Sequence, residues 1–212
     1  MKRWFTLLTA VVVAAGLAGC QTSISDPPDE NLAAKPVIYL YPEEETEVSV
    51  TLDYDGTLTA AWPTYKDGWQ VAAQPDGTLH DAAGNEYSYL FWEGESDTVY
   101  DFSQGFCVAG ADTAAFLRDT LAEIGLTPRE YNEFIVYWLP QMQDNAYNLI
   151  SFQSERYAET AKLDITPAPD SMLRVFMAWK PLDQPQQIEP QSFEPFVRDG
   201  FTVIEWGGCK TA

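Results

Sequence analysis

The chain is organised around the stretch YNEFIVYWLPQMQDNAYNLISF, Tyr131–Phe152. Its first run, Glu133–Leu139, is bulky and apolar at alternating positions on both faces, which is typical of a central strand covered on both sides. A second strand-like run, Asn148–Phe152, follows a polar connection that begins at Pro140. The pattern predicts two strands joined by a polar rim, and this rim is a candidate contact surface for a partner.

The N-terminus has the pattern of a secretory signal peptide. Lys2 and Arg3 precede the apolar run Trp4–Leu17, which is too short and too abruptly ended to span a membrane. The tetrapeptide Leu-Ala-Gly-Cys that ends at Cys20 resembles the bacterial lipobox, whose cysteine is acylated and becomes the mature N-terminus. Residues 1–19 are therefore predicted to be a lipoprotein signal peptide and Cys20 the lipidated residue. An ordinary cleaved signal with a chance cysteine is the alternative.

A lipid anchor implies an extracytoplasmic protein held in the cell membrane or the outer membrane. Residues 20–35 are polar, contain proline and lack apolar periodicity, so we expect a flexible lipidated tether. Residues 36–212 are enough for a single globular β-rich domain, and no second linker of this kind interrupts them.

The chain is strongly acidic, with 12 Lys and Arg against 32 Asp and Glu and a formal charge of −20. Loss of Lys2 and Arg3 with the signal peptide would make the charge −22. Such a surface is repelled by nucleic acid and by anionic lipid headgroups, so nucleic acid is not an expected partner. It can attract divalent cations or basic partners, although solubility on a crowded surface is the simpler explanation.

Two cysteines remain once Cys20 is committed to lipid. Outside the reducing cytosol, Cys107 and Cys209 then have only each other as disulfide partners. A bridge would close a loop of about a hundred residues and contribute about 4–5 kcal/mol in the chain-entropy model. Two separately buried thiols are the alternative, and the sequence leaves both open.

Strand-like runs recur along the rest of the chain. Thr46–Asp53 alternates apolar and polar residues, and Asp55-Gly56 then predicts a hairpin turn. Further strands are expected at Val37–Tyr41, Thr57–Trp62, Gly68–Ala73, Glu86–Trp92, Ser171–Trp179 and Phe201–Trp206. The first third is interpreted as a meander of short antiparallel strands, and Pro181–Pro195 as irregular.

Helix signals lie between these strands. Asp112 is a candidate cap for a helix over Thr113–Ile124 that Gly125 stops. Thr127–Glu130 has the pattern of a capping box with proline at the first helical position, which predicts a short helix leading into the Glu133 strand. The predicted fold class is α+β: a strand-dominated single domain, mainly of antiparallel sheet, with one or two short helices.

Several strings are distinctive enough to suggest a family. They are KPVIYLYP (Lys35–Pro42), PDGTL (Pro75–Leu79), EYSYLFWEGES (Glu86–Ser96), NEFIVYWLPQM (Asn132–Met142), NLISF (Asn148–Phe152), RVFMAW (Arg174–Trp179) and FTVIEWGGC (Phe201–Cys209). Over nearly all of residues 35–209 the chain resembles a family of uncharacterised bacterial lipoproteins and secreted proteins. The resemblance implies one domain and an extracytoplasmic location, with no residue roles to transfer.

Two motifs suggest enzymes but lack the required context. Leu52–Leu58, LDYDGTL, is similar to the first motif of haloacid-dehalogenase-type phosphatases, in which an aspartate attacks phosphorus. That chemistry needs a buried parallel strand before the motif and a helix after it. Here the preceding strand is half exposed and Pro63 and Gly68 follow, so a turn is preferred. His80, the single histidine, has neither a serine-triad nor a zinc-site context.

Four carboxylates follow the aromatic strand Tyr87–Trp92: Glu93, Glu95, Asp97 and Asp101. They could hold Ca²⁺, although the EF-hand spacing is absent. Paired carboxylates beside aromatic rings are also what glycoside hydrolysis requires. A solvated acidic loop is the simplest interpretation.

Six tryptophans beyond the signal region could floor a glycan or peptide groove, but we expect four or more in the core. Two functions remain. The preferred one is a non-enzymatic envelope module that binds a glycan, a peptide or another surface protein. The alternative is a carboxylate-dependent hydrolase of envelope or environmental polysaccharide. No cofactor is established by the sequence, and calcium is the candidate.

Overall fold

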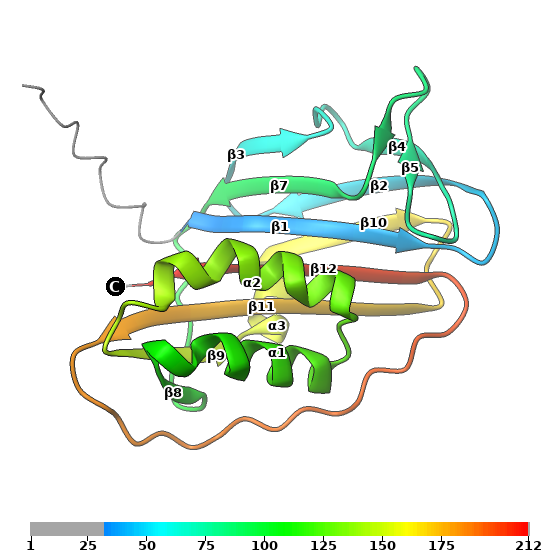
Figure 1. Cartoon of the computed structure of the whole chain (residues 1–212). Coiled ribbons are helices and arrows are strands. Elements are labelled where there is room, and N and C mark those ends of the chain that lie inside the picture. The colour runs from blue at the N-terminus through cyan, green and yellow to red at the C-terminus, as the bar shows by residue number, and fades with distance from the viewer. Residues whose placement is uncertain (1–31, 212) are drawn as a thin grey trace, which may run out of the picture.

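The computed structural model describes residues 32–211, which contain two β-sheets and three α-helices (Figure 1). Sheet A has the strand order β3-β7-β1-β12-β11-β9-β8. Its strands are β1 (Leu32–Tyr41), β3 (Thr57–Trp62), β7 (Leu90–Glu95), β8 (Phe106–Ala109), β9 (Tyr147–Phe152), β11 (Ser171–Leu182) and β12 (Thr202–Lys210).

Sheet B has the order β10-β2-β4-β5-β6. Its strands are β2 (Thr46–Tyr54), β4 (Trp69–Ala73), β5 (Leu79–His80), β6 (Glu86–Tyr87) and β10 (Ala161–Thr166). The helices are α1 (Thr113–Ile124), α2 (Pro128–Met142) and α3 (Ser154–Thr160), and a short 3-10 turn, η1 (Gly110–Asp112), leads into α1. The predicted fold class is confirmed, because strands dominate and, among the described residues, each strand ladder is antiparallel except β11–β12.

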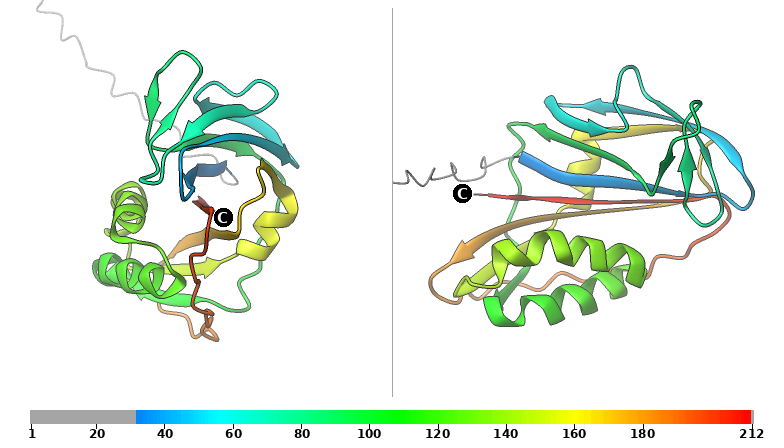
Figure 2. Two further views of the ribbon diagram at one scale, coloured as in Figure 1. Left: turned by 90° about the vertical axis from the view of Figure 1, so that its right-hand side faces the viewer. Right: turned by 45° about the horizontal axis from the view of Figure 1, so that its top comes forward.

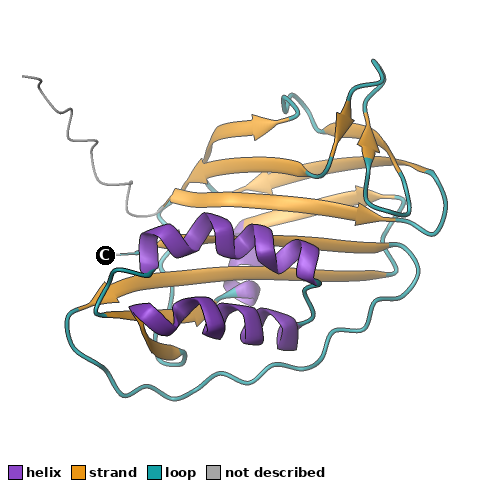
Figure 3. Ribbon diagram, in the orientation of Figure 1, coloured by secondary structure: helices purple, strands orange, loops and turns teal. Residues whose placement is uncertain are grey.

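The elements form layers around sheet A. The pair α1 and α2 covers one face of this sheet, and sheet B lies on the other face with α3 (Figures 2 and 3). Each interface has its own apolar core. Trp138 and Trp206 belong to the helix side, and Trp92 and Val50 to the space between the sheets. At Gly208 on β12 a side chain would meet the Trp138 ring at 2.8 Å, so glycine lets α2 approach the sheet closely.

The predicted strand Glu133–Leu139 is wrong, because this run lies within α2. Phe134, Trp138 and Met142 are spaced by four residues, and all three are buried against sheet A. The capping box is present, with Glu130 Oε2 accepting a hydrogen bond from the Thr127 N–H at 2.7 Å. The cap therefore starts a helix of 15 residues rather than the short helix expected before a strand. The strand at 148–152 is confirmed as part of β9.

The predicted hairpin at Asp55-Gly56 is also wrong. β2 pairs with β10 and β4 in sheet B, whereas β3 pairs with β7 in sheet A, so the turn carries the chain from one sheet to the other. The first third is not a meander for the same reason. At Gly56 a side chain would meet the Glu95 carbonyl oxygen at 2.2 Å, which explains glycine at this crossing.

The folded part begins earlier than predicted. Residues 32–35, assigned to the tether, belong to β1 and pair with β7 and β12. The predicted signal peptide 1–19, the predicted lipidation site Cys20 and tether residues 20–31 lie outside the described residues. No helix within residues 32–211 is long and apolar enough to cross a membrane.

The connection from β11 to β12 is irregular, as predicted for 181–195, apart from the end of β11. It is held along the β8–β9 edge of sheet A. The Gln191 side-chain amide accepts from the Phe152 N–H at 2.8 Å and donates to the Phe152 carbonyl at 2.9 Å. A side chain thus continues the ladder where β8 has ended.

Candidate functional site: an aromatic hollow beside α2

The helices leave part of sheet A uncovered. α2 lies over the middle strands, whereas β7 and β3 continue beyond it to one edge of the sheet (Figure 1). A hollow of about 410 Å³, here called the aromatic hollow, is lined by Lys35, Trp62, Tyr89, Phe91, Glu93 and Tyr137. Aromatic rings with a few polar groups are the usual lining of a small-molecule site.

Strand pairing builds the wall of this hollow. Trp62, the last residue of β3, is the cross-strand partner of Phe91 on β7, and Phe91 is paired on its other side with Val37. Side chains alternate along a strand, so Phe91 and Glu93 share the outer face of β7 while Trp92 faces the core between the sheets. Trp62 and Phe91 are therefore direct neighbours on the open face.

Trp62 differs from the other tryptophans of residues 32–211. It is 59% exposed, whereas none of the others exceeds 3%: Trp69, Trp92, Trp138, Trp179 and Trp206. The prediction that four or more tryptophans are buried is confirmed. A large exposed ring beside other rings marks a surface suited to a partner.

Neighbouring groups hold Trp62 in place. The Tyr87 ring packs edge-on against it, with centroids 5.7 Å apart. The Tyr87 hydroxyl donates to Asp81 Oδ2 at 2.9 Å, and hydrogen bonds from Asn85 lower the pKa of Asp81 to about 2. Trp69 Nε1 donates to the Pro63 carbonyl at 2.8 Å, directly after Trp62. The exposed indole is thus pre-organised, which reduces the entropy lost on binding.

One basic and one acidic residue lie among the rings. The Lys35 backbone N–H donates to Glu93 Oε1 at 3.2 Å. The Lys35 ammonium lies 5.3 Å from the centre of the Tyr137 ring, within the range of a cation–π contact. Burial raises the pKa of Glu93, and the Lys35 N–H bond opposes this shift.

Tyrosines from two elements complete the wall. Burial, with Glu93 nearby, raises the pKa of Tyr137 to about 12, and burial also raises the pKa of Tyr89. Both hydroxyls therefore keep their protons at neutral pH and can donate to a ligand oxygen. The Tyr39 ring packs edge-on against Tyr89, and its hydroxyl donates to Glu133 Oε2 at 3.2 Å, so α2 brings a second carboxylate, besides Glu93 of β7, towards the same wall.

The structure separates the four carboxylates of the predicted acidic cluster. Glu93 faces the aromatic hollow, whereas Glu95, Asp97 and Asp101 are exposed. Among residues 32–211, no group of three or more His, Cys, Asp or Glu side chains is placed to hold a metal ion. The predicted calcium site therefore receives no support from the arrangement of these side chains.

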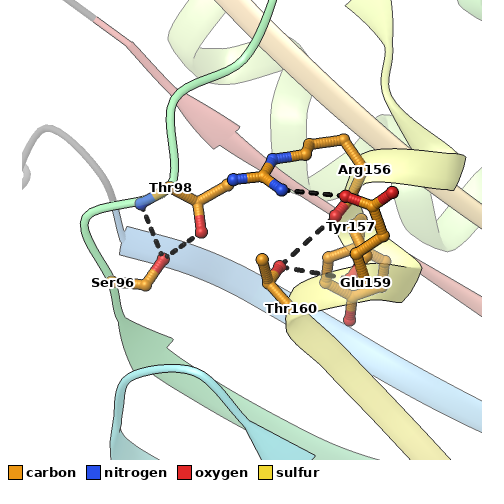
Figure 4. A network of polar contacts seen from close by, with 6 residues as sticks. All are labelled: Ser96, Thr98, Arg156, Tyr157, Glu159 and Thr160. Carbon is orange, nitrogen blue, oxygen red and sulfur yellow. Dashed lines mark hydrogen bonds and ion pairs between the residues drawn. The ribbon is translucent and has the colours of Figure 1, made fainter.

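The segment after β7 has a packing role instead. Tyr100 stacks on Phe176 with ring centres 5.3 Å apart, in the core between the sheets. Ser96 Oγ donates to Thr98 Oγ1 at 3.0 Å, and both residues are drawn with the residues of α3 in Figure 4. The inward residues of this segment cover the core, and its carboxylates alternate outward.

The predicted bridge between Cys107 and Cys209 is not formed, because both cysteines are free thiols. Cys107 lies on β8 and Cys209 on β12, with β9 and β11 between them. Strands are about 4.8 Å apart, so three spacings far exceed the 4.4–6.8 Å between Cα atoms of a typical disulfide. The structure agrees with the alternative of two separate thiols, of which Cys209 is buried and Cys107 partly so.

A second polar cluster is closed inside the protein. Glu205 on β12 is fully buried between the sheets, and its Oε2 accepts from Arg174 Nε at 2.5 Å. Its Oε1 accepts from the Tyr157 hydroxyl at 2.9 Å and from Trp92 Nε1 at 3.3 Å. The Arg174 guanidinium also lies over the Tyr157 ring, 4.7 Å from its centre. Since Glu205 has three protein donors, this cluster is structural.

The remaining sequence candidates lie apart from the hollow. The rim between α2 and β9 is a turn, in which Asn145 Nδ2 donates to Asn148 Oδ1 at 2.7 Å. Asp53 lies on an antiparallel strand and is 3.8 Å from the Lys162 ammonium at the surface, which excludes the phosphatase geometry. His80 lies 3.8 Å from Glu86 on the short strands of sheet B.

The sequence patterns indicate only part of this site. They mark Glu93 as a candidate carboxylate and Trp62 as a candidate groove residue, but they do not mark the remaining lining residues, Lys35, Tyr89, Phe91 and Tyr137. The alternation in EYSYLFWE contained a usable signal, since Tyr89, Phe91 and Glu93 occupy every second position. Tyr137 has no such signal, since the alternation in its segment predicts a strand and the segment forms α2.

Comparison with known proteins places the chain in a family without adding an activity. No family model matches the chain, and no solved structure matches it. An "Uncharacterized protein in bglA 3'region" of Butyrivibrio fibrisolvens is 45% identical over 87 residues, which cover 40% of this chain and 88% of the relative. This chain therefore belongs to the same family as that uncharacterised Butyrivibrio fibrisolvens protein.

Proposed function

We propose that this protein is a lipid-anchored bacterial envelope module that binds a neutral carbohydrate in the aromatic hollow. The observation that carries the proposal is the pre-organised Trp62, 59% exposed and paired with Phe91 beside Tyr89 and Tyr137. The C–H face of a pyranose ring is apolar and packs on aromatic rings, while its hydroxyls accept and donate hydrogen bonds. Lys35, Glu93 and the tyrosines supply those partners.

Electrostatics favour a neutral ligand. The chain has a formal charge of −20, so uronic-acid or phosphate-bearing polymers are repelled at long range. Within the hollow, Lys35 and Glu93 are one cation and one carboxyl group. A neutral sugar is compatible with both the local and the overall charge.

Calorimetric titration of the purified protein with neutral oligosaccharides of β-1,4-linked glucose, xylose, mannose and N-acetylglucosamine tests the binding function. Saturable binding to at least one series is expected, weakened at least about tenfold by Trp62→Ala. That factor corresponds to about 1.4 kcal/mol. Lys162→Ala, at an exposed site on β10, is the matched control and should bind normally. Absence of binding to every series would overturn the proposal.

The anchor is tested separately by cell fractionation. Cys20→Ala should release or mislocalise the protein, because its lipid is the proposed membrane attachment. Membrane partitioning that survives the substitution would overturn the lipoprotein assignment without affecting the binding function.

A carboxylate-dependent hydrolase is the second candidate, and Glu93 is the observation that favours it. A carboxyl group with a raised pKa beside aromatic rings is what a general acid requires, and Glu133 approaches the same wall. Release of reducing ends from the bound oligosaccharide, abolished in both Glu93→Gln and Glu133→Gln, would establish hydrolysis. Binding without product release supports the non-enzymatic module.

A further inference from the structure

A second hollow also has Trp62 in its lining. It has a volume of about 420 Å³, and its lining includes Trp62, Lys66, Gln70, Asp81 and Tyr87. The aromatic hollow and this second hollow therefore share one side chain, and that side chain is the most exposed aromatic ring in either lining. A ring shared by two depressions can contact one ligand that occupies both.

The two hollows have matching chemistry although they come from different parts of the fold. The aromatic hollow contains one basic and one acidic residue, Lys35 and Glu93, and the second hollow contains Lys66 and Asp81. Each lining is thus close to neutral in a chain with a formal charge of −20. Both also contain tyrosine: the aromatic hollow has Tyr89 and Tyr137, and the second hollow has Tyr87.

The loop after Trp62 makes the second hollow part of a fixed surface. Residues 63–68 join β3 of sheet A to β4 of sheet B, and the bond from Trp69 to the Pro63 carbonyl holds the start of this loop. Tyr87 fixes the ring of Trp62 from the β6 side. The two hollows are consequently held in a constant relation to each other.

We infer that the hollows are consecutive subsites for a single linear chain of neutral sugar units that crosses Trp62. This inference rests on the proposed carbohydrate-binding function and adds the path of the ligand over both hollows. A chain that fills both hollows gains the contacts of the second without a second loss of translational freedom, so affinity should rise steeply with length. A short oligosaccharide fills one hollow alone.

Titration with β-1,4-linked gluco- and xylo-oligosaccharides of two, four and six units tests the inference. For a series that binds, Kd should fall at least about tenfold between two and six units. The double variant Lys66→Ala/Gln70→Ala removes exposed side chains of the second hollow only. This variant should reduce the difference in Kd between two and six units to about twofold or less. It should leave the Kd of the two-unit ligand, which fills the aromatic hollow alone, unchanged.

The outcomes separate the inference from the proposed function. Trp62→Ala should weaken every length, because it belongs to both hollows. Binding that is equally tight at two and six units would overturn the two-subsite inference and leave the carbohydrate-binding function standing. A double variant that keeps the wild-type length dependence would overturn it too. If neither series binds while another neutral sugar does, the same lengths of that sugar decide between these results.

Discussion

The two faces of sheet A differ in whether their polar and aromatic groups are buried or exposed to solvent. On the face towards sheet B, Glu205 is fully buried, and its bonds to Arg174, Tyr157 and Trp92 occupy both carboxylate oxygens. On the outer face beyond α2, Trp62 has ring surface open to solvent. Polar groups whose hydrogen bonds are all made inside the protein contribute to stability, whereas exposed and pre-organised groups are available to a ligand. Tryptophan therefore has different roles on the two faces: Trp92 bonds to Glu205 in the core, and Trp62 is exposed to a ligand.

Breaking the buried ion pair should have the largest effect on stability. Arg174→Met leaves the Glu205 carboxylate buried with fewer donors, and it should lower the free energy of unfolding by about 3–5 kcal/mol. Urea denaturation followed by circular dichroism measures this change. Lys162→Met removes the exposed contact to Asp53 and should cost less than about 1 kcal/mol. Equal effects of the two variants would contradict a structural role for the buried pair.

Replacing one tryptophan on each face by alanine compares a buried ring with an exposed one. Trp92→Ala removes a fully buried ring and should cost about 3–5 kcal/mol of unfolding free energy. Trp62→Ala removes a largely exposed ring and should cost less than about 1 kcal/mol, although it weakens ligand binding. Denaturation and calorimetry on both variants give the two readouts. A strongly destabilised Trp62→Ala variant would mean that this ring serves the fold.

The two thiols should differ in reactivity because one belongs to the closed core. Burial raises the pKa of Cys209 to about 12, whereas Cys107 lies partly exposed at the β8 edge. Iodoacetamide should label Cys107 at least tenfold faster than Cys209 in the native protein at pH 8, as mass spectrometry can measure. Both should react after denaturation without reductant. Protection of both under those conditions would instead reveal the bridge.

The pH dependence at Glu93 should be the smallest effect. Its folded pKa is raised, so the native state binds more protons than the unfolded state between about pH 4.5 and the folded value. The wild-type protein therefore loses stability from this group as the pH rises through that window, and Glu93→Gln should not. The variant should gain less than about 1 kcal/mol relative to wild type between pH 4 and pH 7, because the side chain is only half-buried. A relative loss on the same pH change would show that the carboxylate is stabilised in the hollow.

Local patterns in the sequence were sufficient for much of the fold. Alternation at Thr46–Asp53 corresponds to β2, the glycine at 125 stops α1, and the Thr127–Glu130 box starts α2. Each of these signals acts over a few residues, through side-chain alternation or a backbone cap, so no distant segment is needed to read it.

Contacts between distant segments fix the features that neighbouring residues leave open. The run after Glu133 has bulky residues at both period two and period four, and packing of Trp138 on Gly208 selects the helix. Asp55-Gly56 is compatible with a hairpin, but pairing of β3 with β7 sends the chain into the other sheet. The hollow brings together Lys35, Trp62 and Tyr137 from β1, β3 and α2, so it exists only after these elements assemble. Local composition and periodicity were enough to predict the strand-rich class, and they also make Cys20 a candidate anchor. The binding surface depends on strand order and on where α2 leaves the sheet open, and these are non-local contacts.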